Sequence, residues 1–265
     1  QVAYLGAANL LGYLIGALVA APLAERMGAL RVLVICSVAV TLSFAGCSLP
    51  QPMALFFVWR LISGIAGAAL MVLGPSVAMA AAAPQRRATL GPLMFCGIGV
   101  GALLAATLVP MFARSSLSAV WWALTALSAL ALYSGRHAAR QIPLHAPVAI
   151  QPTAVAASST TPWSLAVILV LVAYACDAFG FVPHTVFWVD YLDRELQLGG
   201  AYASTQWAFF GLGAMVGPLC AAYCATRWGW WGTTTGTYAL KAVAIGLPLA
   251  WAGFGGHALS GFLVG

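Results

Sequence analysis

Apolar segments that are long enough to cross a lipid bilayer follow one another along this chain of 265 residues. The hydrocarbon core of a bilayer is about 30 Å thick, and a helix needs roughly 20 mainly apolar residues to span it. Complete segments of this kind occupy residues 3–21, 30–48, 53–82, 91–112, 118–135, 163–189, 202–225 and 233–252. A further segment begins near residue 254. The pattern predicts an all-α, polytopic membrane protein whose partner is the lipid bilayer.

The charge content of the chain excludes a water-soluble globular fold. Charged residues make up 6% of the sequence and hydrophobic residues 63%, whereas a soluble domain carries about 25% charged residues. The net charge of +6 therefore does not indicate nucleic-acid binding, and we expect no nucleic-acid partner. The six cysteines lie in apolar segments and form no CxxC pair. We expect them to be small buried side chains, with no metal site, no disulfide framework and no cofactor.

One helix pattern occurs twice, at a fixed offset of 201 residues. Residues 12–28 read GYLIGALVAAPLAERMG, and residues 213–229 read GAMVGPLCAAYCATRWG. The matching positions are Gly12 and Gly213, Gly16 and Gly217, Leu18 and Leu219, Arg26 and Arg227, and Gly28 and Gly229. This recurrence predicts two homologous halves, which in a membrane protein indicates a transporter architecture.

A polar stretch divides the chain. Residues 136–162 are rich in Ala, Pro, Ser and Thr and lack helical periodicity, which is typical of a flexible linker. We therefore expect an N-terminal helix bundle at 1–135, a linker at 136–162 and a C-terminal bundle at 163–265.

The arginines indicate which loops face the cytoplasm. The odd-numbered loops carry Arg26, Arg31, Arg86, Arg87, Arg136, Arg140 and Arg227, whereas the even-numbered loops carry Arg114 and Arg194. Basic loops stay in the cytoplasm, so the linker is expected to be cytoplasmic and the first span to run inward. A cytoplasmic N-terminus would then need a further helix ahead of Gln1, and we expect the chain to be a fragment.

One helix face in the span at 163–189 combines a charge with aromatic rings. Its members, at spacings of three or four residues, are Tyr174, Asp177, Phe181, His184, Trp188 and Tyr191. A charge at the bilayer centre costs at least about 2.5–3.5 kcal/mol unless it faces a partner or a wet cavity. The stripe therefore suits a cavity wall. Alternatively, Asp177 bonds a neighbouring helix and the rings only pack, and His184 is equally compatible with a structural role.

Two further charges lie inside predicted spans. Arg60 could line the cavity, or it could extend to the outer interface or pair within its own half. Lys241 lies too deep to reach the interface easily, and its stem could bend toward an interior partner. We expect Lys241 to be structural more readily than functional.

The residues that close the repeated helix could form a gate. Glu25 and Arg26, followed by Gly28, end the first copy, and Arg227 and Gly229 end the second. A carboxylate and an arginine at a cytoplasmic turn can hold helix ends together in one conformation and separate in another. The alternative is a solvated pair that contributes under about 1 kcal/mol.

These residues resemble a known family. LAERMG at residues 23–28 is similar to the signature GxLaDRxGRR between the second and third helices of the major facilitator superfamily, although Ala21, Glu25 and the Ala29-Leu30 pair depart from it. RLISG at 60–64 resembles the RxxxG signature of the fourth helix, and the glycines between 91 and 101 resemble the glycine-rich fifth helix. Residues 8–17 and 177–190 resemble the bacterial branch known as YbfB/YjiJ.

The resemblance implies two six-helix bundles, of which this chain would cover the second helix to the start of the tenth. It implies that helices one, four, seven and ten line a central cavity, so that Arg60 and Asp177 each contribute a charge to it. Lys241 would fall on the ninth helix, which is usually peripheral. Glu25 and Arg26 would take part in the cytoplasmic gate.

We therefore expect a secondary transporter of the bacterial inner membrane, monomeric and not an enzyme, that moves a small organic solute by alternating access. Asp177 is expected to couple protons or to bind a cation, with Tyr174, Phe181, His184 and Trp188 around the substrate. A non-transporting receptor or scaffold with the same fold stays open, as does a membrane enzyme, for which few polar residues are present at one depth. The sequence does not indicate the substrate, the direction of transport or the coupling ion.

Overall fold

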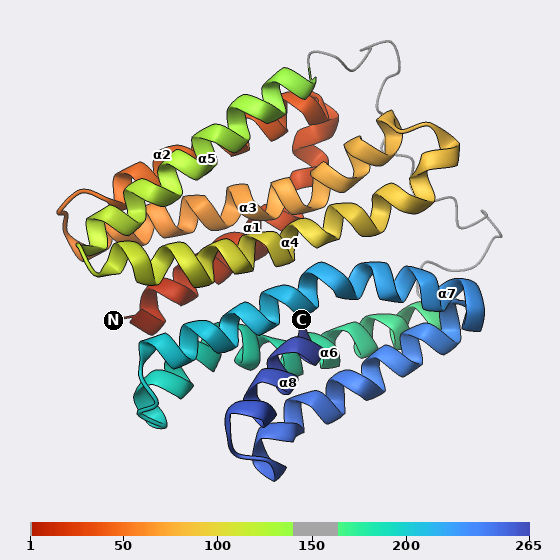
Figure 1. Cartoon of the computed structure of the whole chain (residues 1–265). Coiled ribbons are helices and arrows are strands. Elements are labelled where there is room, and N and C mark those ends of the chain that lie inside the picture. The colour runs from red at the N-terminus through yellow and green to blue at the C-terminus, as the bar shows by residue number, and fades with distance from the viewer. Residues whose placement is uncertain (1, 140–163) are drawn as a thin grey trace. The chain divides into compact units, whose positions relative to one another are not determined.

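The computed structural model describes residues 2–139 and 164–265, and every regular element in these ranges is helical. The elements are α1 (Val2–Met27), α2 (Ala29–Cys47), α3 (Met53–Ala81), α4 (Pro84–Ala113), α5 (Leu117–Ala139), α6 (Leu165–Asp190), the π-helical turn η1 (Tyr191–Glu195), α7 (Gly200–Ala250) and α8 (Phe254–Val264) (Figure 1). Seven of these helices are long and apolar enough to cross a membrane. The predicted all-α membrane fold is confirmed.

Two helix boundaries depend on glycines that adopt positive φ angles. Gly28 (φ 86°) separates α1 from α2, and Gly229 (φ 73°, ψ 168°) interrupts α7. A residue with a Cβ atom rarely adopts these angles. Helix α7 therefore consists of two segments, 200–228 and 230–250, which correspond to the predicted spans at 202–225 and 233–252.

The chain divides into two compact units. Of the described residues, the first comprises 2–88 and 111–139, and the second comprises 89–110 and 164–265. The middle of α4 therefore groups with the second unit, although the sequence analysis assigned it to the N-terminal bundle. Helix α5 continues to Ala139, so residues 136–139 of the expected linker are helical. The rest of that linker, 140–162, lies outside the described residues.

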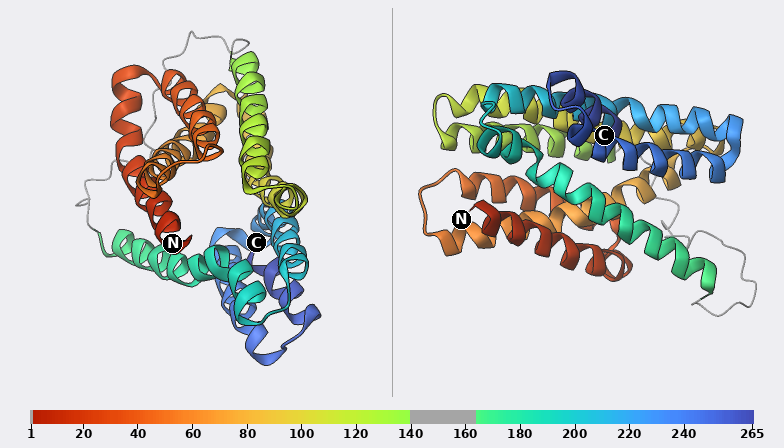
Figure 2. Two further views of the ribbon diagram at one scale, coloured as in Figure 1. Left: turned by 90° about the vertical axis from the view of Figure 1, so that its left-hand side faces the viewer. Right: turned by 90° about the horizontal axis from the view of Figure 1, so that it is seen from below.

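In the first unit, α1 and α2 both pack on α3, and α2 also contacts α5 (Figure 2). Helices α1 and α3 approach so closely that the glycines at their contact leave no room for a Cβ atom. A Cβ atom at Gly12 would collide with the backbone oxygen of Leu61, and one at Gly64 would collide with that of Asn9. Small residues of this kind allow helices to pack tightly in membranes.

The second unit repeats this contact at the same offset of 201 residues. A Cβ atom at Gly213 would collide with the backbone oxygen of Phe262, and one at Gly265 with that of Phe210. Each of these positions is the counterpart of one in the α1–α3 contact. The predicted duplication is therefore present in the packing of α7 on α8 as well as in the sequence.

The cysteines divide between the interior and the surface. Cys36, Cys47 and Cys96 are buried, as expected, but Cys176 and Cys220 are exposed and Cys224 is partly exposed. The expectation is wrong for these three positions, whose side chains remain accessible to solvent. All six are free thiols.

Candidate functional site

Helix α6 carries the acidic and aromatic stripe. Ser164 caps its first turn, where the Ser164 hydroxyl accepts a hydrogen bond from the backbone N–H of Val167 at 3.4 Å. Burial increases from Tyr174, which is 68% exposed, to His184 at 7% and Trp188 at 6%, and Tyr191 at the end of the stripe is again 40% exposed. His184 and Trp188 therefore face the interior of the second unit, whereas Tyr174 lies on its outside.

The central residue of the stripe forms an ion pair with α7. The Lys241 Nζ atom lies 2.8 Å from Oδ1 and 2.9 Å from Oδ2 of Asp177. The same ammonium lies 4.2 Å from the centroid of the Phe181 ring. Both side chains are largely buried, at 21% exposure for Asp177 and 17% for Lys241. The ammonium is thus held by the carboxylate and by the negative face of an aromatic ring.

Sequence reasoning named both charges but did not pair them. The resemblance placed Lys241 on a peripheral helix, and Arg60 was the expected counterpart of Asp177. One indication was available: Asp177 and Lys241 are both charges in predicted spans of the C-terminal half, and an ion inside a membrane needs a partner. The two side chains come together only because α6 packs on α7, and the sequence alone does not predict that packing.

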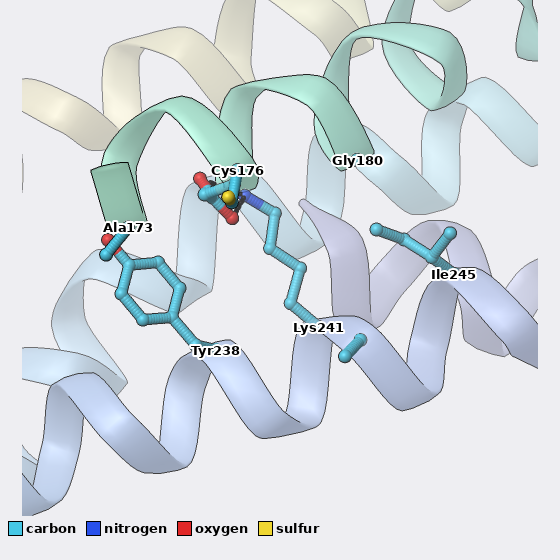
Figure 3. A pocket seen from close by; sticks show the side chains of 8 residues that line it. Ala173, Cys176, Gly180, Tyr238, Lys241 and Ile245 are labelled. Carbon is cyan, nitrogen blue, oxygen red and sulfur yellow. Dashed lines mark hydrogen bonds and ion pairs between the residues drawn. The ribbon is translucent and has the colours of Figure 1, made fainter. Parts of the chain in front are cut away.

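The ion pair lies at a cavity of about 410 Å³ between α6 and the second segment of α7. Figure 3 shows Cys176 and Gly180 of α6 opposite Tyr238, Lys241 and Ile245 of α7. Most of the lining is apolar, so the charged pair is the main polar feature of its wall. A cavity of this kind can hold a small organic molecule.

A second cavity of about 260 Å³ continues the first toward the C-terminal end of α6. It is lined by Gly180, His184, Phe187, Trp188, Tyr191 and Ile245, so Gly180 and Ile245 are shared by the two cavities. The His184 ring stacks on Trp188 with centroids 4.3 Å apart. These shared residues make the two hollows neighbours along one face of α6.

Trp188 also joins this stripe to α8. The edge-on ring of His257 lies with its centroid 5.6 Å from that of Trp188. The Nδ1 atom of His257 is 2.8 Å from the Tyr202 hydroxyl at the start of α7. Sequence reasoning missed His257 and Tyr202, because neither belongs to a charged or repeated pattern.

Arg60 belongs to the first unit. Its guanidinium lies 5.7 Å from the centroid of the Trp121 ring, and its backbone oxygen accepts a hydrogen bond from the Asn9 amide at 3.2 Å. Among the described residues, no carboxylate forms an ion pair with Arg60. Its role at a substrate site stays a prediction.

The predicted gate residues lie at helix ends. Glu25 and Arg26 are exposed in the last turn of α1, ahead of Gly28. The Arg227 guanidinium lies 5.6 Å from the ring centroid of Tyr223. Arg227 precedes Gly229 by two residues. Within the described part of the first unit, Glu25 forms no ion pair, so the gate stays a prediction.

The candidate site does not resemble a metal centre. Among residues 2–139 and 164–265, no three His, Cys, Asp or Glu side chains gather closely enough to hold an ion. What the second unit presents is an ion pair and an aromatic cluster on two adjoining cavities.

Comparison with known proteins decides the family. The family described as "Uncharacterised MFS-type transporter YbfB" matches residues 1–265. The chain belongs to this family. The resemblance to the major facilitator superfamily is thereby confirmed, and so is the assignment as a multi-pass membrane protein.

Parts of the chain also match curated proteins that are named as transporters. A 3-(3-hydroxy-phenyl)propionate transporter of Escherichia coli is 40% identical over 127 residues, which are 46% of this chain and 30% of that protein. A glucose transport protein of Synechocystis is 32% identical over 115 residues, 42% of this chain and 25% of that protein. An MFS-type transporter, mpsC, of Macrophomina phaseolina is 37% identical over 91 residues, which are 32% of this chain and 18% of that protein. The matched stretches thus span less than a third of each relative.

Proposed function

We propose that the intact protein is a secondary active transporter of the bacterial inner membrane that moves a small organic solute by alternating access, coupled to protons. The membership in a transporter family and the duplicated helix contact support the architecture. The aromatic side chains along α6 favour an organic solute over an inorganic ion. The protein acts as a monomer, and Glu25, Arg26 and Arg227 belong to its cytoplasmic gate.

The observation that carries this proposal is the Asp177–Lys241 ion pair on the wall of the larger cavity. Asp177 lies midway along α6, at the depth where transporters bind substrates and coupling ions. A proton that binds Asp177 removes its charge and weakens its hold on Lys241. Because charges interact strongly where little water is present, this protonation would change the packing of α6 against α7. Asp177 is thus the coupling carboxylate, with Lys241 as its partner.

The names of the relatives suggest the first solutes to try. One relative is named for glucose and another for 3-(3-hydroxyphenyl)propionate. The full-length protein would be reconstituted in liposomes that contain a pH-sensitive dye. We expect one of these solutes to cause proton movement across the membrane, and Asp177→Asn to abolish it.

The matched control is Asp190→Asn. Asp190 also lies on α6 and pairs with Arg194 at 2.9 Å, but its side chain is 48% exposed and does not line either cavity. Asp190→Asn should leave proton movement unchanged. Proton movement that survives Asp177→Asn would contradict the coupling role. Solute binding without any proton or solute flux would contradict the transporter and favour a receptor.

A further inference from the structure

Buried polar atoms without hydrogen-bond partners occur on both α6 and α7. Nε2 of His184 and Nε1 of Trp188 are buried, and neither has a hydrogen-bond partner among the described residues. Both side chains line the smaller cavity and are less than 10% exposed. Gln206 of α7 is fully buried, and its amide nitrogen and oxygen both lack a partner in the described part of the chain.

The packing of α6 on α7 places Gln206 at the depth of His184. At one level, Trp188 of α6 packs with Ala203 of α7. At another level, the Phe181 ring of α6 lies 6.1 Å from that of Phe210 on α7. His184 lies between the two α6 residues, and Gln206 lies between the two α7 residues. The three polar side chains therefore lie at neighbouring levels of the α6–α7 contact, with Gln206 buried outside the lining of the two cavities.

Buried polar groups of this kind are destabilising unless something bonds them. Burial without a partner removes the hydrogen bonds that the group makes to water, and native proteins satisfy most such groups. Inside a membrane the requirement is stronger, because no bulk water is available. A layer with four unpartnered polar atoms is thus a poor structural core. It is suited to a molecule that supplies the missing bonds.

The chemistry of the layer favours a ligand that presents hydroxyl groups to it. The indole N–H can only donate, the amide of Gln206 offers both a donor and an acceptor, and His184 contributes a ring nitrogen. Hydroxyl groups can both donate and accept, so they can satisfy all of these groups. A carboxylate could not donate to the Gln206 oxygen, and the nearby cation, Lys241, is already paired with Asp177.

We infer that His184, Trp188 and Gln206 form a hydrogen-bonding subsite for the hydroxyl groups of the solute, as a sugar or a phenol would present them. The inference rests on the proposed transport function and adds Gln206 to its binding residues. The aromatic rings of His184 and Trp188 contact the apolar face of the same ligand, and the ion pair at the adjoining cavity stays available for coupling.

The first test measures thermal unfolding of the full-length protein without ligand. Gln206→Met keeps a side chain of similar length and removes two unpartnered atoms, so its midpoint should rise by about 2 °C or more. The matched control is Ser260→Ala, because Ser260 is equally buried but donates a hydrogen bond to the Ala244 backbone oxygen at 2.7 Å. Its midpoint should fall. A fall for Gln206→Met like that of Ser260→Ala would overturn the inference.

The second test compares 3-(3-hydroxyphenyl)propionate with 3-phenylpropionate, which lacks the hydroxyl group, and includes glucose as a sugar probe. Binding to the folded state raises the unfolding midpoint. In the wild type, 3-(3-hydroxyphenyl)propionate or glucose should raise it, and 3-phenylpropionate should raise it much less. In Gln206→Met this difference should disappear. No shift with any hydroxylated probe, or a preference that persists in Gln206→Met, would overturn the inference.

The two proposals fail in different ways. If proton-coupled flux is equally selective in Gln206→Met and in the wild type, the subsite is contradicted and the transport function stands. If binding is hydroxyl-selective and depends on Gln206 but no flux occurs, the transport function is contradicted and the binding site stands.

Discussion

At the scale of single residues, the Asp177–Lys241 pair joins two mostly buried charges that each need the other as a partner. Each charge is mostly buried, and each would be left without a partner if the other were removed. Loss of one member of a buried pair costs about 3–5 kcal/mol, whereas replacing both members can be close to neutral. The pair is therefore open to a test by double substitution.

We predict that Asp177→Asn and Lys241→Met each lower the free energy of unfolding by about 3 kcal/mol, and that the double variant regains most of this loss. The reason is that each single variant leaves one ion buried without its partner. Chemical or thermal unfolding of the four proteins in detergent measures the coupling. Strictly additive losses would show that the two side chains do not depend on each other.

The sequence identified both charges of the Asp177–Lys241 ion pair but did not pair them. The stripe from Phe181 to Trp188 could be read because three- and four-residue spacings place residues on one helix face. Gln206 could not be read as a site residue, because a single glutamine near a span end looks ordinary. Its importance comes from complete burial without a partner, which only the packing of α7 reveals.

At the scale of elements, two pairs of helices are held by the same glycine contact. Because the collisions involve backbone atoms, a flexible neighbour cannot move aside. We predict that Gly12→Val in α1 and Gly213→Val in α7 each prevent correct packing, seen as loss of the folded peak in size-exclusion chromatography and a much lower unfolding midpoint.

The control for this prediction is Gly67→Ala in α3. A Cβ atom there would meet nothing within 4 Å, and alanine favours a helix over glycine by about 0.8–1 kcal/mol. Gly67→Ala should therefore keep or raise stability. Equal tolerance of Gly12→Val and Gly67→Ala would contradict the close α1–α3 contact.

Element boundaries were largely readable from the sequence, since apolar length and glycine positions determine them. The break between the two segments of α7 follows Gly229, which the repeat had already marked as the partner of Gly28. The compact unit to which α4 belongs was harder to predict from the sequence. Its middle, residues 89–110, packs with the second unit through contacts such as Gly99 against Met215. The periodicity of α4 does not predict which unit it packs against.

At the scale of the whole molecule, the proposal requires the cavity of the second unit to change its access during transport. Cys176 lies on the wall of that cavity beside Asp177 and is exposed. In a Cys220→Ser, Cys224→Ser background, a membrane-impermeant thiol reagent should modify Cys176 at a rate that changes several-fold when a transported solute is added. An unchanged rate, with solute flux intact, would argue against movement at this cavity.

The central claim is that Asp177 couples solute movement to protons. The most direct measurement compares two activities of the same proteoliposomes with a labelled solute that causes proton movement: accumulation driven by a pH gradient, and exchange of labelled for unlabelled solute without a gradient. Asp177→Asn should lose accumulation and keep exchange, because a permanently neutral side chain still allows the conformational cycle. Asp190→Asn should keep both. Gradient-driven accumulation by Asp177→Asn at the wild-type level would contradict the account.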